Sequence, residues 1–167
     1  AMHVDDFGSK DYFIADLVSG LLTNGESSLL YQNLIMKSKI CTEIQSYVTD
    51  NKASNLFVIE GKLSPNVEIK DVFNRISDCM EGLQKKALSK NQYETVINKA
   101  TTYWAFNLYS PMNLAQNMAI FQHCIQTEDV RIYVASMFKE IQKVDIENFI
   151  GNKLDFNKFS RLTYLPV

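Results

Sequence analysis

Residues 43–63, EIQSYVTDNKASNLFVIEGKL, contain the pattern that decides the fold. Apolar and polar residues nearly alternate over Glu43–Thr49, which is typical of a strand with one buried face. Asp50–Asn55 is rich in turn residues, and Leu56–Leu63 is rich in β-branched and aromatic residues. The sequence therefore predicts an antiparallel β-hairpin at this place.

Helical patterns precede and follow the hairpin. Apolar residues recur at helical spacing over Lys10–Leu22 and again over Ser27–Met36. Capping residues, or proline in the first turn, predict five further helix starts. These starts are Ser64-Pro65, Ser89 with Gln92 at capping-box spacing, Ser110-Pro111, Thr127, and Asp145 for a short helix to Ile150.

Strands are predicted near both ends of the chain. Val4–Phe7 reads as the tail of a strand, and Lys158–Leu165 alternates before Pro166 ends it. Together the elements predict an α+β fold, with helices packed on one face of a small, mainly antiparallel β-sheet. The length of 167 residues predicts a single domain over residues 1–167. Because Ala1-Met2 resembles the remnant of a cloning site, we expect a fragment of a longer chain.

Composition excludes several classes of function. A net charge of -2 provides no basic surface for nucleic acid. No apolar run reaches the roughly 20 residues needed to span a bilayer, and the polar, acidic start predicts no signal peptide. The three cysteines are odd in number and widely spread, which predicts free thiols in a reducing compartment. We therefore expect the cytoplasm, with the periplasm as the alternative.

The residues that could carry chemistry form no recognisable catalytic or metal-binding motif. The only histidines are His3 and His123, and no His-x-x-Glu-His or Cys-x-x-Cys spacing exists. No Gly-x-Ser-x-Gly elbow is present, the glycines are scattered singly, and no pair of acids has a distinctive spacing. The sequence predicts no catalytic residue, no metal site and no cofactor in this chain. The aromatic patch over residues 103–109 is interpreted as core or domain interface rather than a stacking platform.

The order of several short motifs resembles one protein family. Asp11-Tyr12 at a helix start, Gly25-Glu26-Ser27-Ser28 in a turn, and the helix Leu30-Tyr31-Gln32-Asn33-Leu34 before a hairpin are similar to the second half-domain of pitrilysin/insulinase-type zinc metallopeptidases. That family includes the mitochondrial processing peptidases. The resemblance covers nearly the whole chain, and it continues in Leu56–Gly61, Leu88-Ser89 and Ser160–Pro166.

The resemblance implies a function for a larger assembly. In this family two half-domains close around a peptide substrate, and the first half carries the zinc and the general-base glutamate. The second half often supplies an arginine and, seven residues later, a tyrosine that orient the substrate. Those positions are Ile35 and Thr42 here, and the arginine common after the paired serines is Leu29. Isoleucine has no hydrogen-bond donor and threonine lacks the reach of a phenol, so no family site residue is assigned to this chain.

The resemblance therefore predicts the non-catalytic C-terminal half-domain of a bacterial-type zinc metallopeptidase, whose partner is an N-terminal, zinc-bearing half-domain or subunit. One alternative is an inactive, peptidase-like scaffold or assembly subunit, and another is an unrelated α+β binding domain. A homodimer through a free sheet edge is a further expectation.

Overall fold

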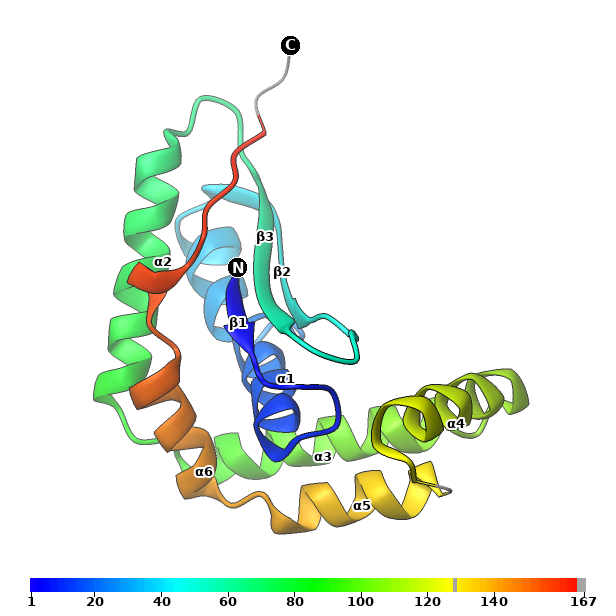
Figure 1. Ribbon diagram of the computed structural model, residues 1–167. Helices are drawn as coiled ribbons and strands as arrows, with labels where there is room; N and C mark the ends of the chain where they lie inside the picture. Colours follow the sequence, from blue (N-terminus) through cyan, green and yellow to red (C-terminus); the bar gives the residue numbers. More distant parts are fainter. Residues whose placement is uncertain (128, 165–167) are drawn as a thin grey trace.

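The structure is a computed structural model that describes residues 1–127 and 129–164 (Figure 1). Its three strands are β1 (Met2–Val4), β2 (Cys41–Val48) and β3 (Asn55–Leu63). Its α-helices are α1 (Lys10–Thr23), α2 (Ile69–Lys85), α3 (Lys90–Asn107), α4 (Pro111–Ile125), α5 (Val130–Glu140) and α6 (Lys143–Asn148). Two π-helical segments, η1 (Tyr31–Lys37) and η2 (Phe149–Lys153), and a 3-10 turn, η3 (Phe156–Lys158), complete the elements.

The predicted hairpin supplies β2 and β3 of an antiparallel sheet with strand order β1-β3-β2, in which β3 is central and β2 is an edge strand. Gln45 lies opposite Glu60, and Val48 lies opposite Phe57. The pairing shifts between Cys41 and Glu43, which makes Thr42 the additional residue of a β-bulge. On the other side of β3, β1 pairs through Met2 opposite Phe57. The predicted first strand exists, but it covers Met2–Val4 rather than Val4–Phe7.

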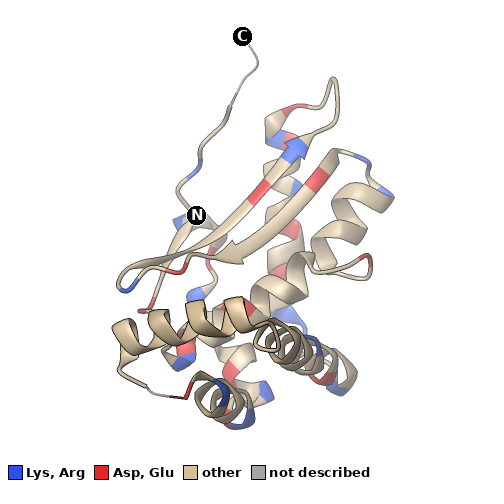
Figure 2. Ribbon diagram, turned by 90° about the vertical axis from the view of Figure 1, so that its right-hand side faces the viewer, with Lys and Arg blue, Asp and Glu red and all other residues tan. Residues whose placement is uncertain are grey.

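Helices cover one face of this sheet, as the predicted α+β architecture requires. Alternate residues of the hairpin, including Cys41, Val48 and Phe57, are buried beneath the helices. Tyr47 and Glu60 lie on the opposite face and are exposed. In Figure 2 the helices gather on one side of the sheet, and acidic and basic residues are interspersed over the ribbon. The sheet therefore has one packed face and one face open to solvent.

The first helix is the centre of the core. Phe13 is fully buried, and its ring packs edge-on against Phe138 at a centroid distance of 5.6 Å. Phe121 of α4 is also fully buried, and its ring lies 5.0 Å from Phe7 and 5.9 Å from Trp104. These contacts hold the α3–α4 pair against the start of the chain. Among the described residues, no helix is long and apolar enough to cross a membrane.

Several predicted helix starts are confirmed. Ser89 accepts a hydrogen bond from the backbone N–H of Gln92, and the Gln92 side chain accepts one from Ser89 in return. Pro111 occupies the first turn of α4. The helix predicted over Ser27–Met36 is present largely as η1, in which the N–H of Ser38 donates to the carbonyl of Asn33.

Three predicted starts are wrong. Pro65 lies in a turn with Asn66 at φ +63°, so α2 begins at Ile69 after Glu68. Asp129, rather than Thr127, caps α5, because its carboxylate accepts from the N–H groups of Arg131 and Ile132. Gln142 is the N-cap of α6, and Asp145 lies in the first turn with its carboxylate accepting from the N–H of Gln142 at 2.8 Å.

The predicted last strand, Lys158–Leu165, is also wrong over the residues that the structure describes. Lys158 belongs to a 3-10 turn, and residues 159–164 have no assigned strand. Ser160 nevertheless exchanges two backbone hydrogen bonds with Ala1, each 2.8 Å long. An alternating sequence needs a free neighbouring edge to become a strand, and this segment pairs at one residue only. Residue 165 lies outside the described residues.

Candidate functional site

The two positions that the resemblance singles out lie in one groove. Ile35 from η1 and Thr42 from β2 both line a cavity of about 550 Å³ at the free edge of the hairpin. Tyr31 lies one turn before Ile35, and Glu60 and Lys62 of β3 border the groove from the other side. The tertiary structure thus brings Ile35 and Thr42 to a common surface. Leu29, the third such position, packs against the core and does not line this groove.

Local backbone irregularities position both residues. After the end of η1 the N–H of Ile40 donates to the carbonyl of Leu34 at 2.9 Å, and Leu34 is fully buried beside the half-buried Ile35. Thr42 occupies the β-bulge, and its hydroxyl donates to the carbonyl of Lys62 at 3.3 Å. Bulges and π-helical turns both redirect side chains relative to regular structure.

A polar network extends from the groove over the open face of the sheet. The Gln45 amide donates to one carboxylate oxygen of Glu60, and the Tyr47 hydroxyl lies 3.4 Å from the other. Desolvation and the negative charge of Glu60 raise the pKa of the Tyr47 phenol. No motif in the sequence marked these residues, although the alternation over Glu43–Thr49 and the hairpin pairing were the available signals. The network offers hydrogen-bonding groups to a ligand on the open face.

The groove contains no complete catalytic arrangement. Ile35 is apolar, and the Thr42 hydroxyl donates to a backbone carbonyl rather than to a base. Burial raises the pKa of the Cys41 thiol, which disfavours the reactive thiolate. His3 and His123 are exposed on β1 and α4. Over residues 1–127 and 129–164, no three His, Cys, Asp or Glu side chains are placed to hold a metal ion.

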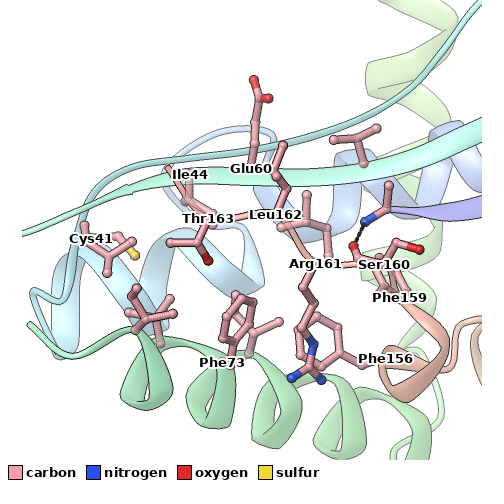
Figure 3. Close-up of a pocket in the computed structure, with 18 of the residues that line it drawn as sticks. Cys41, Ile44, Glu60, Phe73, Phe156, Phe159, Ser160, Arg161, Leu162 and Thr163 are labelled. Carbon is pink, nitrogen blue, oxygen red and sulfur yellow. Dashed lines mark hydrogen bonds between the residues drawn. The ribbon is translucent and has the colours of Figure 1, made fainter. Parts of the chain in front are cut away.

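A second cavity, of about 540 Å³, lies between β3, α2 and the C-terminal segment 159–164 (Figure 3). Its walls are mainly apolar. The Arg161 guanidinium lies over the rings of Phe73 and Phe156, at 4.8 Å and 5.1 Å from their centroids. This cation–π contact fixes the C-terminal segment against α2. This cavity could not be predicted from the sequence, because it depends on residues far apart in the chain.

Comparison with known proteins identifies the family. The family model of the peptidase M16 inactive domain matches residues 1–100. No curated protein sequence matches this chain. Among solved structures, a protease from Helicobacter pylori has a TM-score of 0.82 at 19% identity, over 93% of this chain and 38% of that chain. This chain therefore spans well under half the length of that protease.

Two other solved structures are nearer to this chain in length. A "putative zinc protease" from Bordetella pertussis Tohama I has a TM-score of 0.81 at 17% identity, over 99% of this chain and 92% of that chain. The "Inactive Peptidase Domain of a Putative Zinc Protease" from Bordetella parapertussis has a TM-score of 0.75 at 18% identity, over 89% of this chain and 79% of that chain. These likenesses establish the shared fold, and the family match confirms the resemblance found in the sequence. The chain therefore belongs to the peptidase M16 family, as an inactive domain.

Proposed function

We propose that this chain is the non-catalytic half-domain of a zinc-dependent peptidase, and that it closes a peptide chamber against a zinc-bearing half-domain located elsewhere. The observation that carries the proposal is the match of residues 1–100 to an inactive peptidase domain. The 38% coverage of the Helicobacter pylori protease supports a role within a larger assembly. Zinc bound in the other half would supply a metal-activated water to attack the peptide carbonyl.

The open face of the sheet supports a peptide-facing role for this chain. The groove around Ile35 and Thr42 presents backbone at the β-bulge, and Gln45 and Glu60 add polar groups beside it. The outer edge of β2 is closed at one point, because the Ser46 N–H donates to the Thr23 hydroxyl at 2.9 Å. A peptide would therefore contact the groove and the open face rather than add a full strand to β2.

The test requires the polypeptide that carries the zinc motif. The parent reading frame and its neighbours would be searched for His-x-x-Glu-His, and that half would be expressed with and without this chain. We expect this chain alone to bind no stoichiometric zinc by metal analysis and to cleave no fluorogenic peptide. Mixing the two halves should produce peptidase activity well above that of the zinc-bearing half alone. Stoichiometric zinc on this chain would overturn the proposal.

A scaffold or assembly subunit is the second candidate. Ile35 and Thr42 favour it, since the substrate-orienting arginine and tyrosine that the resemblance leads one to expect are absent. A complex that forms between the halves but stays inactive, or a locus with no His-x-x-Glu-His motif, would support the scaffold. Neither outcome requires a homodimer, which sedimentation of this chain alone would test.

We also propose the cytoplasm as the location. The three cysteines are unpaired, which supports a reducing compartment. Fractionation of cells with an antibody to this chain would distinguish the cytoplasm from the periplasm.

A further inference from the structure

The second cavity lies along an unpaired edge of the central strand. β2 pairs with one edge of β3 as far as Leu63, whereas β1 pairs with the other edge only over residues 55–57. Within residues 1–127 and 129–164, this second edge of β3 therefore has no partner strand over residues 58–63. The cavity of about 540 Å³ borders that edge.

The alternation of hydrogen bonds along a strand identifies the backbone groups that border the cavity. The Leu56 carbonyl accepts from the N–H of Thr49, so the even-numbered residues of β3 direct their backbone groups toward β2. The backbone groups of Ile59 and Gly61 therefore point away from β2, toward the cavity that both residues line. Among the described residues, neither has a backbone hydrogen-bond partner on that side.

The C-terminal segment, red in Figure 1, forms the opposite wall of the cavity. Ser160 exchanges two hydrogen bonds with Ala1, as in an antiparallel pair, so the segment runs antiparallel to β1 and parallel to β3. The Arg161 side chain points toward α2, whereas Leu162 is 85% exposed, which is the alternation of an extended chain. The backbone groups of Leu162 therefore point to the same side as those of Ser160.

The lining shows that this cavity lies in the plane of the sheet. Val58 and Glu60 come from the open face of β3, and Ile59 and Leu63 come from its packed face. A cavity bordered by both faces runs beside a strand rather than above or below it. Phe73 and other side chains of α2 give it an apolar floor (Figure 3). The cavity therefore follows the line of β1.

The sequence of the C-terminal segment is an independent indication of what binds there. Lys158–Leu165 alternates as a strand does, yet only Ser160 finds a backbone partner. Unpaired N–H and C=O groups on two walls require hydrogen bonds, which an apolar small molecule does not supply. The edge of another folded sheet does not fit between two walls. A single extended polypeptide segment satisfies both conditions.

We propose that an extended peptide segment binds between β3 and residues 160–164 as an additional strand in line with β1, antiparallel to both walls. Its source is the polypeptide that carries the zinc-bearing half-domain, and this part rests on the proposed function. Because this chain matches the C-terminal, inactive half, a segment from the preceding half would approach with its carboxyl end toward Ala1. Alternate side chains of the segment would be apolar against α2, and the others polar beside Glu60.

Two sets of probes test the site and its source separately. The first is an acetylated, amidated octapeptide that alternates valine with lysine and threonine, and the second is a set of octapeptides that tile the zinc-bearing polypeptide. Fluorescence anisotropy would measure binding to this chain, and amide hydrogen exchange by NMR would locate it. We expect saturable binding, with exchange of the Ile59, Gly61 and Leu162 amides slowed by about tenfold or more. The Ser46 amide, which already donates to Thr23, is the internal control.

N-methylated probes distinguish insertion between two walls from addition to one edge. Successive N–H groups of a bound strand point to opposite sides, so one set bonds to β3 and the other to residues 160–164. Methylating either set should weaken binding by about tenfold or more. Leu162→Pro removes one donor of the C-terminal wall and should also weaken binding. Thr163→Pro, at a position whose N–H points away from the cavity, is the matched control.

Three results would overturn the proposal: protection confined to β2 or to the groove around Ile35 and Thr42, sensitivity to one methylated set only, or no saturable binding by either probe set. Binding of the valine-rich octapeptide without any tiling peptide, or a locus without a zinc-bearing half, would overturn the source. The zinc analysis and the mixing experiment are independent of these titrations, so failure of this site is distinguishable from failure of the proposed function.

Discussion

The phenol of Tyr12 donates a hydrogen bond to Oδ1 of Asp50, and this bond joins the first turn of α1 to the end of β2. Tyr12 is buried, whereas Asp50 is exposed to solvent. The contact closes the hairpin end of the sheet against the helical layer. It also holds Asp50 at a cavity between α1, the end of β2 and the α3–α4 pair, which Asp16 lines as well.

Replacing Tyr12 by phenylalanine should remove this bond while keeping the ring in the core. We expect the free energy of unfolding to fall by about 1 kcal/mol, since Asp50 regains water in place of the phenol. Urea denaturation would measure the change. Tyr109→Phe, at a position 87% exposed, is the control and should stay within about 0.5 kcal/mol of the unmodified protein. Equal effects of the two changes would contradict the assignment.

Gly61 lies opposite Ile44, beside the β-bulge, where the backbone leaves no room for a Cβ. A Cβ built at Gly61 lies 2.8 Å from the carbonyl oxygen of Glu43, which is backbone and cannot move aside easily. We expect Gly61→Ala to lower the free energy of unfolding by about 2 kcal/mol. In α2, a Cβ at Gly82 meets nothing within 4 Å, so Gly82→Ala should raise stability by about 0.5–1 kcal/mol. Thermal denaturation of both variants would show shifts of opposite sign.

The Asp16 carboxyl should make stability depend on pH. Its pKa rises from 3.8 to about 6 in the folded protein, so between these values the folded state binds more protons than the unfolded state. Stability therefore decreases as pH rises through this window and stays lower above it. The groups that face Asp16 are Tyr12, Asp50 and Tyr103, none of which supplies a compensating positive charge.

Asp16→Asn should remove this dependence. At about pH 7.5 the variant should be more stable by on the order of 2 kcal/mol, and the difference should vanish near pH 4. Chemical denaturation at the two pH values measures both quantities. A variant that is less stable at neutral pH would show that the carboxylate has a favourable partner.

A serine precedes both α3 and α4, and only the serine of α3 forms a capping box. Ser89 accepts from the Gln92 N–H at 3.1 Å, whereas Ser110 precedes α4 without a capping hydrogen bond from its side chain. We expect Ser89→Ala to cost about 1 kcal/mol of unfolding free energy, and Ser110→Ala less than about 0.5 kcal/mol. Urea denaturation would separate them. Similar losses at both positions would mean that capping does not decide the start of α3.

Local signals explain which elements were predictable. The hairpin follows from alternation over a few residues, and the start of α3 follows from Ser89 and Gln92, three positions apart. Where the prediction was wrong, the local sequence was compatible with a second structure. Pro65 is compatible with a helix start and with a turn, and Asn66 in the left-handed region selects the turn. The alternation over Lys158–Leu165 is compatible with a strand, yet only Ser160 finds a backbone partner, at Ala1.

The sequence by itself determined the α+β class, the hairpin and the peptidase family, because each rests on residue patterns within short segments. Only the tertiary structure decided which side chains share a surface. The groove joins Ile35 to Thr42 across two backbone irregularities, and the cavity between α1, the end of β2 and the α3–α4 pair is lined by Asp16, Asp50 and Trp104 together. The physical reason is that spacing along a chain sets the direction of a side chain within its own element, whereas its neighbours depend on how elements pack.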